Sequence, residues 1–454
     1  MFSNLCQILT VLTVRGSNKY YICFPVNYGS IDVNKKDNNC IMLKRHKSII
    51  TIVVLSLLCS CIDPYTPKLS GYSSLLVVDG LITDANSSYI VRLSRTFQDQ
   101  NSTPPPVSDA TVFISDDAGN NNNLINGGNG IYKTDSTQFN GSPGRTYVLH
   151  IKTSDGSEYE SDACLMNPVP DIDSIYFAKD QQLVNNGTQT QDGISIYLDS
   201  KEGDNNQYYR WAYEETWKFK VSDPKKFNYV KTSDPNNPIF MPIADVKEFC
   251  WKNRQSDEIL IRSISDGQPK KISKQPVIFI ATGESDRLLL QYNILVKQYS
   301  ISKNEFDFWN SLKQVNETGG DIFARQPYAV LSNIHSTNNP KERVLGYFQV
   351  SAVSQQRKNI LYRDVALMGL PFYSYPCRTL EYNPMDFATL CMCPPPTWDD
   401  VYWHLCIIED YAFIEPTFNQ VSDILLELVF TRPECANCEL TGTSKRPYFW
   451  VDLN

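Results

Sequence analysis

Histidine is scarce in this sequence of 454 residues, which contains only four. The chain has no His-Glu-x-x-His pair for a catalytic zinc, no Gly-x-Ser-x-Gly around a nucleophilic serine and no glycine-rich phosphate loop. It also lacks an uninterrupted apolar run of the about 20 residues that a membrane-spanning helix needs. The sequence therefore shows none of the usual signatures of zinc proteases, α/β-hydrolases, P-loop ATPases or helical membrane proteins.

The most apolar stretch runs from Ile49 to Leu58, directly behind a basic cluster at residues 44–47. Charge, a short apolar run and then small residues ending in cysteine is the layout of an export signal. The run Leu-Cys-Ser-Cys that ends at Cys61 resembles the lipobox of a bacterial lipoprotein, in which the signal is removed and the new N-terminal cysteine carries lipid. Cys61 is the expected lipidation site because Ser60 is the small residue wanted before the cut, whereas Cys59 follows a bulky leucine. The alternative is a buried core helix.

The residues around this signal divide into three further segments. Residues 1–41 fit no part of an export signal, so we interpret them as an extension created by a start codon assigned too early, with Met42 as the true start; the alternative is a genuine cytoplasmic extension. Residues 42–60 form the predicted lipoprotein signal peptide. Residues 61–70 contain two prolines and are expected to form an extended, lipidated tether.

Basic residues are fewer than acidic ones, and the formal net charge is −8. Cleavage before Cys61 would leave 35 basic against 48 acidic residues, a charge of −13. An acidic protein without a basic run repels phosphate backbones, so nucleic acid is not expected as a partner. The expected partner is a lipid membrane, reached through the N-terminal lipid at the outer membrane, on either its periplasmic or its cell-surface face.

Residues 71–166 are predicted to form a β-sandwich of the immunoglobulin or prealbumin type. Apolar and polar residues alternate in several short runs, which is typical of strands with one buried face. Turn residues separate the runs at intervals that favour a sandwich. The alternating apolar positions are Tyr89, Val91, Leu93, Val112, Ile114, Tyr147, Leu149 and Ile151.

Residues 167–454 are predicted to form a larger β-rich domain with a few short helices and a cysteine-rich end. An aromatic run at Tyr208–Val221 favours a long sheet strand. One helix is well signalled, since Ser302 and Glu305 have the spacing of a capping box and apolar residues follow at helical spacing. The chain as a whole is thus predicted to be mainly β, with two domains.

Eight cysteines follow Cys61, and an even number in an exported chain favours disulfide bonds. Their pairing is not assigned, because eight cysteines allow 105 connectivities. The alternatives are a four-thiolate zinc site formed by Cys391, Cys393, Cys435 and Cys438, and a thioredoxin-like redox pair of Cys435 and Cys438. Export favours disulfides over both, and no cofactor is expected. The candidate disulfide cysteines are Cys164, Cys250, Cys377, Cys391, Cys393, Cys406, Cys435 and Cys438.

One cluster could support hydrolysis. Asp399 and Asp400 precede an aromatic pair and His404, so two carboxylates and an imidazole lie within six positions. A surface turn leading into a strand explains these residues equally well. The hydrolytic site therefore stands as an alternative hypothesis.

The end of the chain carries a recognisable motif: Cys435-Ala-Asn-Cys438, then Gly442, then residues 445–450 with the sequence Lys-Arg-Pro-Tyr-Phe-Trp. It resembles the closing motif of a Bacteroidota lipoprotein family known as domain of unknown function 4249. Further residues support the resemblance: Cys61–Tyr65, Val78–Gly80, Gln298–Ser302, Phe308–Trp309, Asn339–Pro340 and Val344–Phe348.

This resemblance implies an outer-membrane lipoprotein of the kind often associated with TonB-dependent receptors. It implies no reaction, so no catalytic residue is transferred to this chain. We therefore expect a non-enzymatic accessory protein that captures a nutrient or another ligand for a receptor, with aromatic residues as stacking surfaces. The alternatives are a structural or adhesive cell-surface protein and a hydrolase centred on Asp399, Asp400 and His404.

Overall fold

The computed structural model describes residues 74–97, 103–184, 187–203, 207–265, 270–318, 330, 332–384 and 396–453. The fold is mainly β with a few short helices, which confirms the predicted class. None of the helices within these ranges has the length and apolarity that crossing a membrane would require. The predicted signal peptide, the lipidation site Cys61 and the tether lie outside the described residues, as do Cys391 and Cys393.

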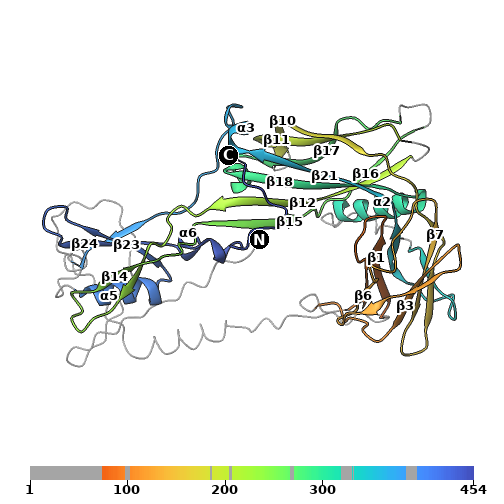
Figure 1. Ribbon diagram of the computed structural model, residues 1–454, viewed down its shortest axis with the longest axis horizontal. Coiled ribbons are helices and arrows are strands. Elements are labelled where there is room, and N and C mark those ends of the chain that lie inside the picture. The colour runs from red at the N-terminus through yellow and green to blue at the C-terminus, as the bar shows by residue number, and fades with distance from the viewer. Residues whose placement is uncertain are drawn as a thin grey trace, which may run out of the picture. The chain divides into compact units, whose positions relative to one another are not determined.

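A β-sandwich contains the N-terminal strands (Figure 1). One sheet has the order β20-β1-β2-β6-β5, and the other has the order β19-β8-β7-β3-β4, with β9 also paired to β7. Both sheets contribute to a single apolar core, because alternation places every second side chain on the inner face. The strands are β1 (Leu76–Ile82), β2 (Ile90–Arg95), β3 (Thr111–Asp116), β4 (Asn121–Asn123), β5 (Ile125–Asn126), β6 (Ile131–Lys133), β7 (Thr146–Lys152), β8 (Glu158–Ser161), β9 (Cys164–Leu165), β19 (Ile334–Ser336) and β20 (Leu345–Val350).

Two strands of this sandwich come from far along the chain. β20 pairs in parallel with β1, and β19 pairs with β8. Gly346 has φ +87, and a Cβ at this position would lie 1.9 Å from the carbonyl oxygen of Val78, so only glycine fits where the two strands meet. The division at residue 166 stays a prediction, but the sheets on its N-terminal side also include β19 and β20, which follow much later in the sequence.

The central part of the chain forms two further sheets that share a second core. One has the order β10-β11-β17, and the other has the order β15-β12-β18-β21, with β16 also paired to β12 (Figure 1). We call the second one the central sheet. The elements are β10 (Ile172–Val184), β11 (Gln189–Ser200), β12 (Tyr208–Lys220), β15 (Phe249–Gln255), β16 (Leu260–Ser263), β17 (Gln275–Ala281), η1 (Asp286–Leu288), β18 (Gln291–Ser300), β21 (Val353–Leu361) and α3 (Tyr362–Ala366).

Helix α2 (Lys303–Thr318) begins where the sequence predicts. The N–H of Glu305 donates to the hydroxyl of Ser302 at 3.1 Å, which is one half of the expected capping box. The carboxylate of Glu305 is buried and accepts instead from Trp309 Nε1 at 3.3 Å and from Ser351 Oγ at 3.4 Å. Burial raises the pKa of Glu305 to about 7, although the nearby charge of Arg210 opposes this shift.

This buried carboxyl group predicts a pH-dependent stability. Because the folded pKa lies above the unfolded value of 4.5, its stabilising contribution is complete below pH 4.5 and is lost as the pH rises through about 7. The loss is of the order of 3 kcal/mol. Urea titrations at pH 4.5 and 7.5 measure the change in unfolding free energy with pH. Glu305→Gln is expected to remove this part of the pH dependence, while Glu381→Gln on an exposed strand position should retain it. An unchanged pH dependence in Glu305→Gln would contradict the assignment.

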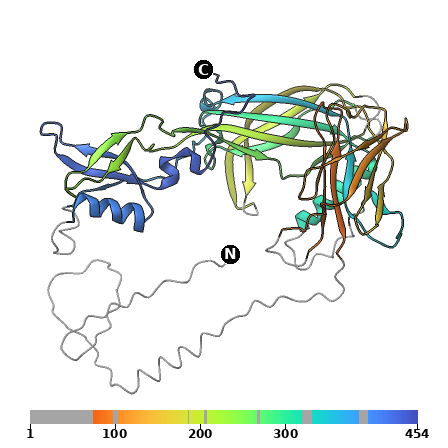
Figure 2. The same cartoon turned by 60° about the horizontal axis from the view of Figure 1, so that its bottom comes forward.

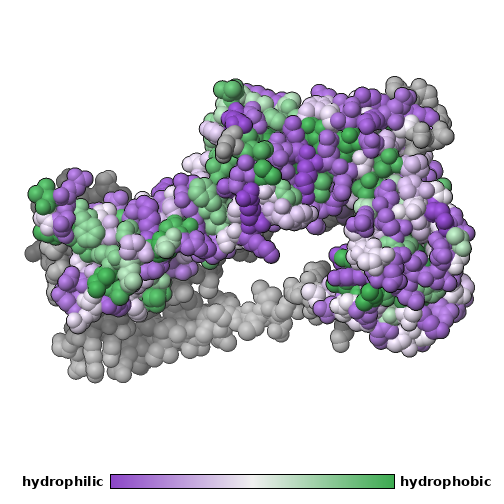
Figure 3. Space-filling view, in the orientation of Figure 1, coloured by the Kyte–Doolittle hydropathy of each residue, from purple (hydrophilic) through white to green (hydrophobic). Residues whose placement is uncertain are grey.

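A third apolar cluster lies in the C-terminal part. Hairpin β13–β14 and the sheet β22-β24-β23 contribute to it, and the helical turn formed by α5 and η2 packs against them (Figure 2). On the face drawn in Figure 3, apolar residues reach the surface interspersed with hydrophilic ones. The elements are β13 (Phe227–Val230), β14 (Ile239–Pro242), β22 (Leu380–Tyr382), α5 (Trp398–Trp403), η2 (His404–Ile408), β23 (Ala412–Phe418), β24 (Leu425–Thr431), α6 (Pro433–Ala436) and η3 (Cys438–Leu440).

Candidate functional site: a groove beside the central sheet

The two faces of the central sheet differ in chemistry. On β12, every second residue from Tyr209 to Phe219 points into the core, and the residues between them point to the opposite, polar face. On that face Thr216 lies opposite both Asn253 and Asn293, and Asn293 lies opposite Asn359. A row of amide and hydroxyl side chains thus crosses four adjacent strands.

Hydrogen bonds fix the side chains of this row. Thr216 Oγ1 donates to Asn253 Oδ1 at 2.8 Å, and Asn293 Nδ2 donates to Asn359 Oδ1 at 2.8 Å. Arg357 donates to Asn293 Oδ1 at 2.8 Å. Because these groups are held by neighbours, the polar face presents a defined set of donors and acceptors.

The last residues of the chain cover part of this face. We call residues 439–453 the C-terminal segment. Trp450 is buried, with its ring 6.1 Å from that of Trp251, and Phe449 lies under the guanidinium group of Arg357 at 3.6 Å. Tyr448, which precedes both, is 96% exposed. Trp450 is thus buried against the sheet, whereas Tyr448 faces solvent.

Polar contacts hold the C-terminal segment in place. Gln291 Nε2 donates to the carbonyl of Val451 at 2.8 Å, and its Oε1 accepts from the N–H of Leu453 at 3.2 Å. Lys218 pairs with Asp452 at 3.0 Å. These contacts are all made by residues of the polar face, so the segment is fitted to that face rather than to the apolar core.

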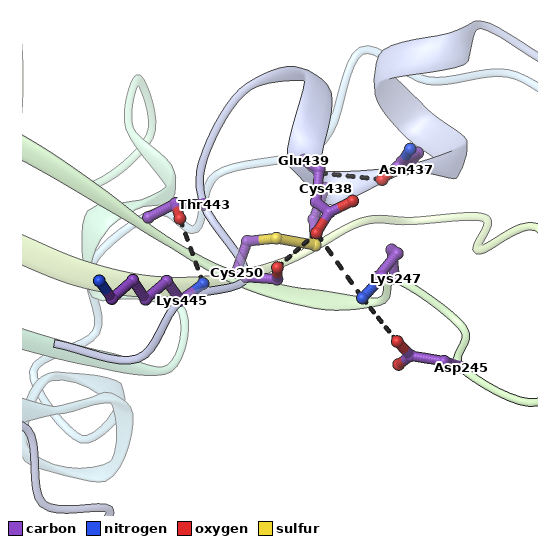
Figure 4. The surroundings of a disulfide bond; sticks show 9 residues. Asp245, Lys247, Cys250, Asn437, Cys438, Glu439, Thr443 and Lys445 are labelled. Atoms are coloured by element: carbon purple, nitrogen blue, oxygen red, sulfur yellow. Dashed lines mark hydrogen bonds and ion pairs between the residues drawn. A yellow bond between two sulfur atoms is a disulfide. The ribbon is translucent and has the colours of Figure 1, made fainter.

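A disulfide bond between Cys250 and Cys438 joins β15 to the start of this segment (Figure 4). Beside it Lys247 lies between two carboxylates, 2.6 Å from Asp245 and 3.6 Å from Glu439 (Figure 4). The bond closes a loop across 188 positions of the sequence. It therefore fixes one end of the C-terminal segment against the edge of the central sheet.

Two adjoining cavities lie between the C-terminal segment and β15, and together we call them the groove. The larger has a volume of about 530 Å³, and the smaller about 400 Å³. Asn253 and Arg254 line both cavities. The larger is also lined by Glu214, Thr216, Gln255, Arg446, Tyr448 and Phe449, and the smaller by Trp217, Trp251, Lys252, Thr441, Gly442 and Thr443. Aromatic rings combined with a few polar groups are typical of ligand sites.

Glu215 also lines the larger cavity. Burial raises its pKa, while Arg287 at 3.3 Å and the hydroxyl of Tyr292 at 2.9 Å stabilise its charged form. Its side chain is fully buried, and the neighbouring Glu214 points to the opposite sheet face, where it pairs with Lys297 at 2.5 Å. The two carboxylates therefore do not converge on one reacting atom, as a glycosidase would require.

The sequence-predicted cluster has structural contacts of its own. Asp400 accepts from the N–H of Thr397 at 2.9 Å and from its hydroxyl at 2.7 Å, so it completes a capping box with Thr397, the N-cap residue of α5. These hydrogen bonds lower the pKa of Asp400. Asp399 accepts from the hydroxyl of Tyr229 at 2.7 Å, and His404 Nε2 lies 3.6 Å from Glu409. The three residues thus face different partners.

This arrangement predicts that Asp400 matters for stability. Replacing it with alanine removes both bonds to Thr397 and is expected to cost about 1 kcal/mol, the usual value of a helix cap. Urea unfolding of Asp400→Ala beside Glu409→Ala, an exposed acidic residue close by, measures the difference. Equal stability of the two variants would contradict the capping role.

The cysteines are partly paired. Cys250 bonds to Cys438, and Cys377 bonds to Cys435, so the two cysteines of the Cys-x-x-Cys motif belong to different disulfides. This pairing excludes them as a redox pair or as zinc ligands. Cys164 and Cys406 have free thiols, which corrects the expectation of disulfides at these two positions. Among the residues with described positions, no cluster of three or more histidine, cysteine or acidic residues could hold a metal.

The free thiols are held in unreactive surroundings. Burial raises the pKa of Cys164 to about 12, and burial also raises the pKa of Cys406. Cys164 lies on β9 close to the amide of Asn333, at 3.3 Å. A thiol with a raised pKa is mostly protonated at neutral pH and is a poor nucleophile.

The fold and the groove define a mainly β protein with a ligand-sized site on a sheet edge. A family model described as domain of unknown function (DUF4249) matches residues 62–357. The chain belongs to this family, as the sequence resemblance predicts. The closing motif at residues 435–450 lies beyond the matched range. No curated protein matches the chain.

Sequence reasoning missed the groove. The amides of Asn253, Asn293 and Asn359 are far apart in the sequence, and only strand register places them in one row. In β12 aromatic residues of the core alternate with polar residues, and this pattern alone could have predicted that one face of the sheet is polar. The closing motif that carried the resemblance forms one wall of the groove.

Proposed function

We propose that this protein is a non-enzymatic lipoprotein of the outer membrane that holds a ligand for a TonB-dependent receptor. The lipid on Cys61 anchors the chain, and the groove beside the central sheet holds the ligand. The proposal on the membrane rests on the signal layout at residues 42–61. The two disulfide bonds support it, because such bonds persist in oxidising compartments outside the cytoplasm.

The observation that carries the binding role is the groove itself. It combines aromatic rings with amides, carboxylates and cations within two adjoining cavities. The fully buried acid of its lining, Glu215, is paired with Arg287 and accepts a hydrogen bond from Tyr292. A site with recognition groups and without a converging acid–base pair is suited to binding.

Affinity purification from envelope membranes tests this function. Because the N–H of Leu453 helps to hold the C-terminal segment on Gln291, the tag belongs in the exposed turn at Val421 rather than at the C-terminus. A β-barrel receptor of the TonB-dependent class is expected in stoichiometric amount, and the untagged strain is the control. If no such receptor is recovered while the tagged protein is, the receptor-accessory role is wrong and a structural or adhesive role is favoured.

A further inference from the structure

Strand β15 forms one edge of the central sheet. The C-terminal segment pairs with this edge at a single point, where Trp251 and Thr443 exchange two backbone hydrogen bonds of 2.9 and 3.0 Å. The chain therefore already uses the edge of β15 for strand pairing. Beyond this bridge the C-terminal segment leaves the edge and forms the outer wall of the groove.

Alternation determines which backbone groups of β15 face outward. Since the N–H and C=O of Trp251 point away from β12, those of Asn253 and Gln255 point away as well. The N–H of Ser256 donates back to Tyr213 of β12 at 2.9 Å, which agrees with this alternation. Within the described parts of the chain, the outward backbone groups of Asn253 and Gln255 have no hydrogen-bonding partner.

The two cavities of the groove adjoin along this edge, and each is lined by residues of both sheet faces, since Asn253 on the polar side and Arg254 on the core side line both. The smaller is lined by Trp217 and Lys252, which lie opposite each other on the core side of the sheet. The larger is lined by Thr216 and Gln255 on the polar side. Side chains of an added strand alternate between the two faces. An incoming strand on this edge would therefore direct side chains of both its faces into the groove.

Charge adds a preference. Four cations line the groove, although the protein as a whole is acidic. Three of them are engaged with acidic residues: Lys252 with Asp286, Arg254 with Asp257 and Arg446 with Asp452. The side chain of Lys445, which is exposed, forms no ion pair with any residue whose position is described. An acidic side chain on the ligand would complement this cation.

We propose that the open edge of β15 at Asn253 and Gln255 binds an extended peptide with an acidic side chain, which adds to the central sheet as a further strand. Unpaired strand edges are the groups that peptides pair with in this mode of recognition. The inference rests on the proposed function in taking the groove as the ligand site, and it names the class of ligand. A glycan has no backbone to match the outward N–H and C=O groups.

Selection from a phage-displayed library of random heptapeptides on the immobilised full chain provides the probe. Gln255→Pro removes one outward N–H but leaves the hydrogen bonds to β12 in place. The immobilised variant therefore serves to remove from the library those peptides that bind elsewhere on the chain. Peptides that bind the unmodified chain at least tenfold better than Gln255→Pro are expected, and Asp or Glu should be enriched in them. Equal recovery on both surfaces would overturn the proposal.

The selected peptide then allows two further tests, the first of which uses only the unmodified chain. N-methylation of its alternate amides in one register should abolish binding, and methylation in the other register should leave it within about threefold. Lys445→Glu should weaken the peptide at least fivefold, whereas Lys133→Glu on a remote strand should not. Equal effects of both methylation patterns would contradict strand addition.

Two other occupants of the edge give distinct results. If a second copy of the chain pairs there, sedimentation will show a dimer that Gln255→Pro dissociates, and the peptide proposal fails. If a glycan array binds the chain and Gln255→Pro binds it equally, strand addition fails too. Recovery of the receptor with tagged Gln255→Pro would show that the proposed function holds even where the peptide inference does not.

Discussion

The double variant Cys250→Ala/Cys438→Ala is expected to lose about 2–5 kcal/mol of stability, the largest change in unfolding free energy expected for this chain. The reason is the length of the loop that this bond closes, since the residues lie 188 positions apart. In the chain-entropy account, closure of so long a loop restricts the unfolded ensemble by about 5 kcal/mol. Urea unfolding measures the loss.

The same variant should also open the groove. Without the bond at Cys438, the C-terminal segment is held by non-covalent contacts alone, among them the Trp251–Thr443 bridge and the contacts of Gln291 and Lys218. Faster hydrogen exchange is expected throughout residues 439–453. Cys377→Ala/Cys435→Ala removes a bond across 58 positions and is the matched control. It should lower stability but leave exchange in this segment slow, and the opposite pattern would contradict the clamping role of Cys250.

Cys61→Ala is expected to remove the protein from the outer membrane. The variant lacks the sulfur to which the anchoring lipid would be joined, and a precursor that keeps its apolar signal should stay at the inner membrane. We expect at least a tenfold fall in the outer-membrane fraction, measured by separating the two membranes and immunoblotting. The uncleaved precursor should accumulate.

Cys59→Ala provides the control for this prediction. It alters a cysteine two positions away and keeps the small Ser60 before the predicted cut. It should mature and fractionate as the unmodified protein does. If Cys59→Ala and Cys61→Ala behave alike, the choice of Cys61 as the lipidation site is wrong.

Local patterns predicted the elements well where burial alternates along a short run. Val91 and Leu93 in β2, and Leu149 and Ile151 in β7, are all buried as their spacing indicates. The start of α2 follows from the hydroxyl of Ser302. Each of these features depends on residues within a few positions, so the sequence contains the whole signal.

Features that depend on distant residues were not predictable in this way. The parallel pairing of β20 with β1 joins residues more than 250 positions apart, and alternation identifies a buried face without naming its partner. The disulfide pairing has the same character, because eight cysteines permit many connectivities. The carboxylate of Glu305 was expected to complete a cap, but its contact with Ser351 draws it into a buried junction.

The candidate site shows both limits. The residues of the closing motif were singled out from the sequence, and the structure places Arg446 and Tyr448 in the groove. The residues of β12 and β15 that line the groove with them could not be predicted from the sequence, since only the strand register brings Thr216 beside Asn253. Asp400 attracted attention as a possible acid, and its spacing from Thr397 was the overlooked sign of a helix cap.

The mass of the mature protein tests the central claim that this chain is anchored outside the cytoplasm. Full-length protein extracted from membranes with detergent should begin at Cys61 and carry the added mass of a lipid on that residue. Its N-terminal peptide should lack residues 1–60. A mature chain that retains the segment at residues 42–60, or that begins at Cys61 without lipid, would contradict the account.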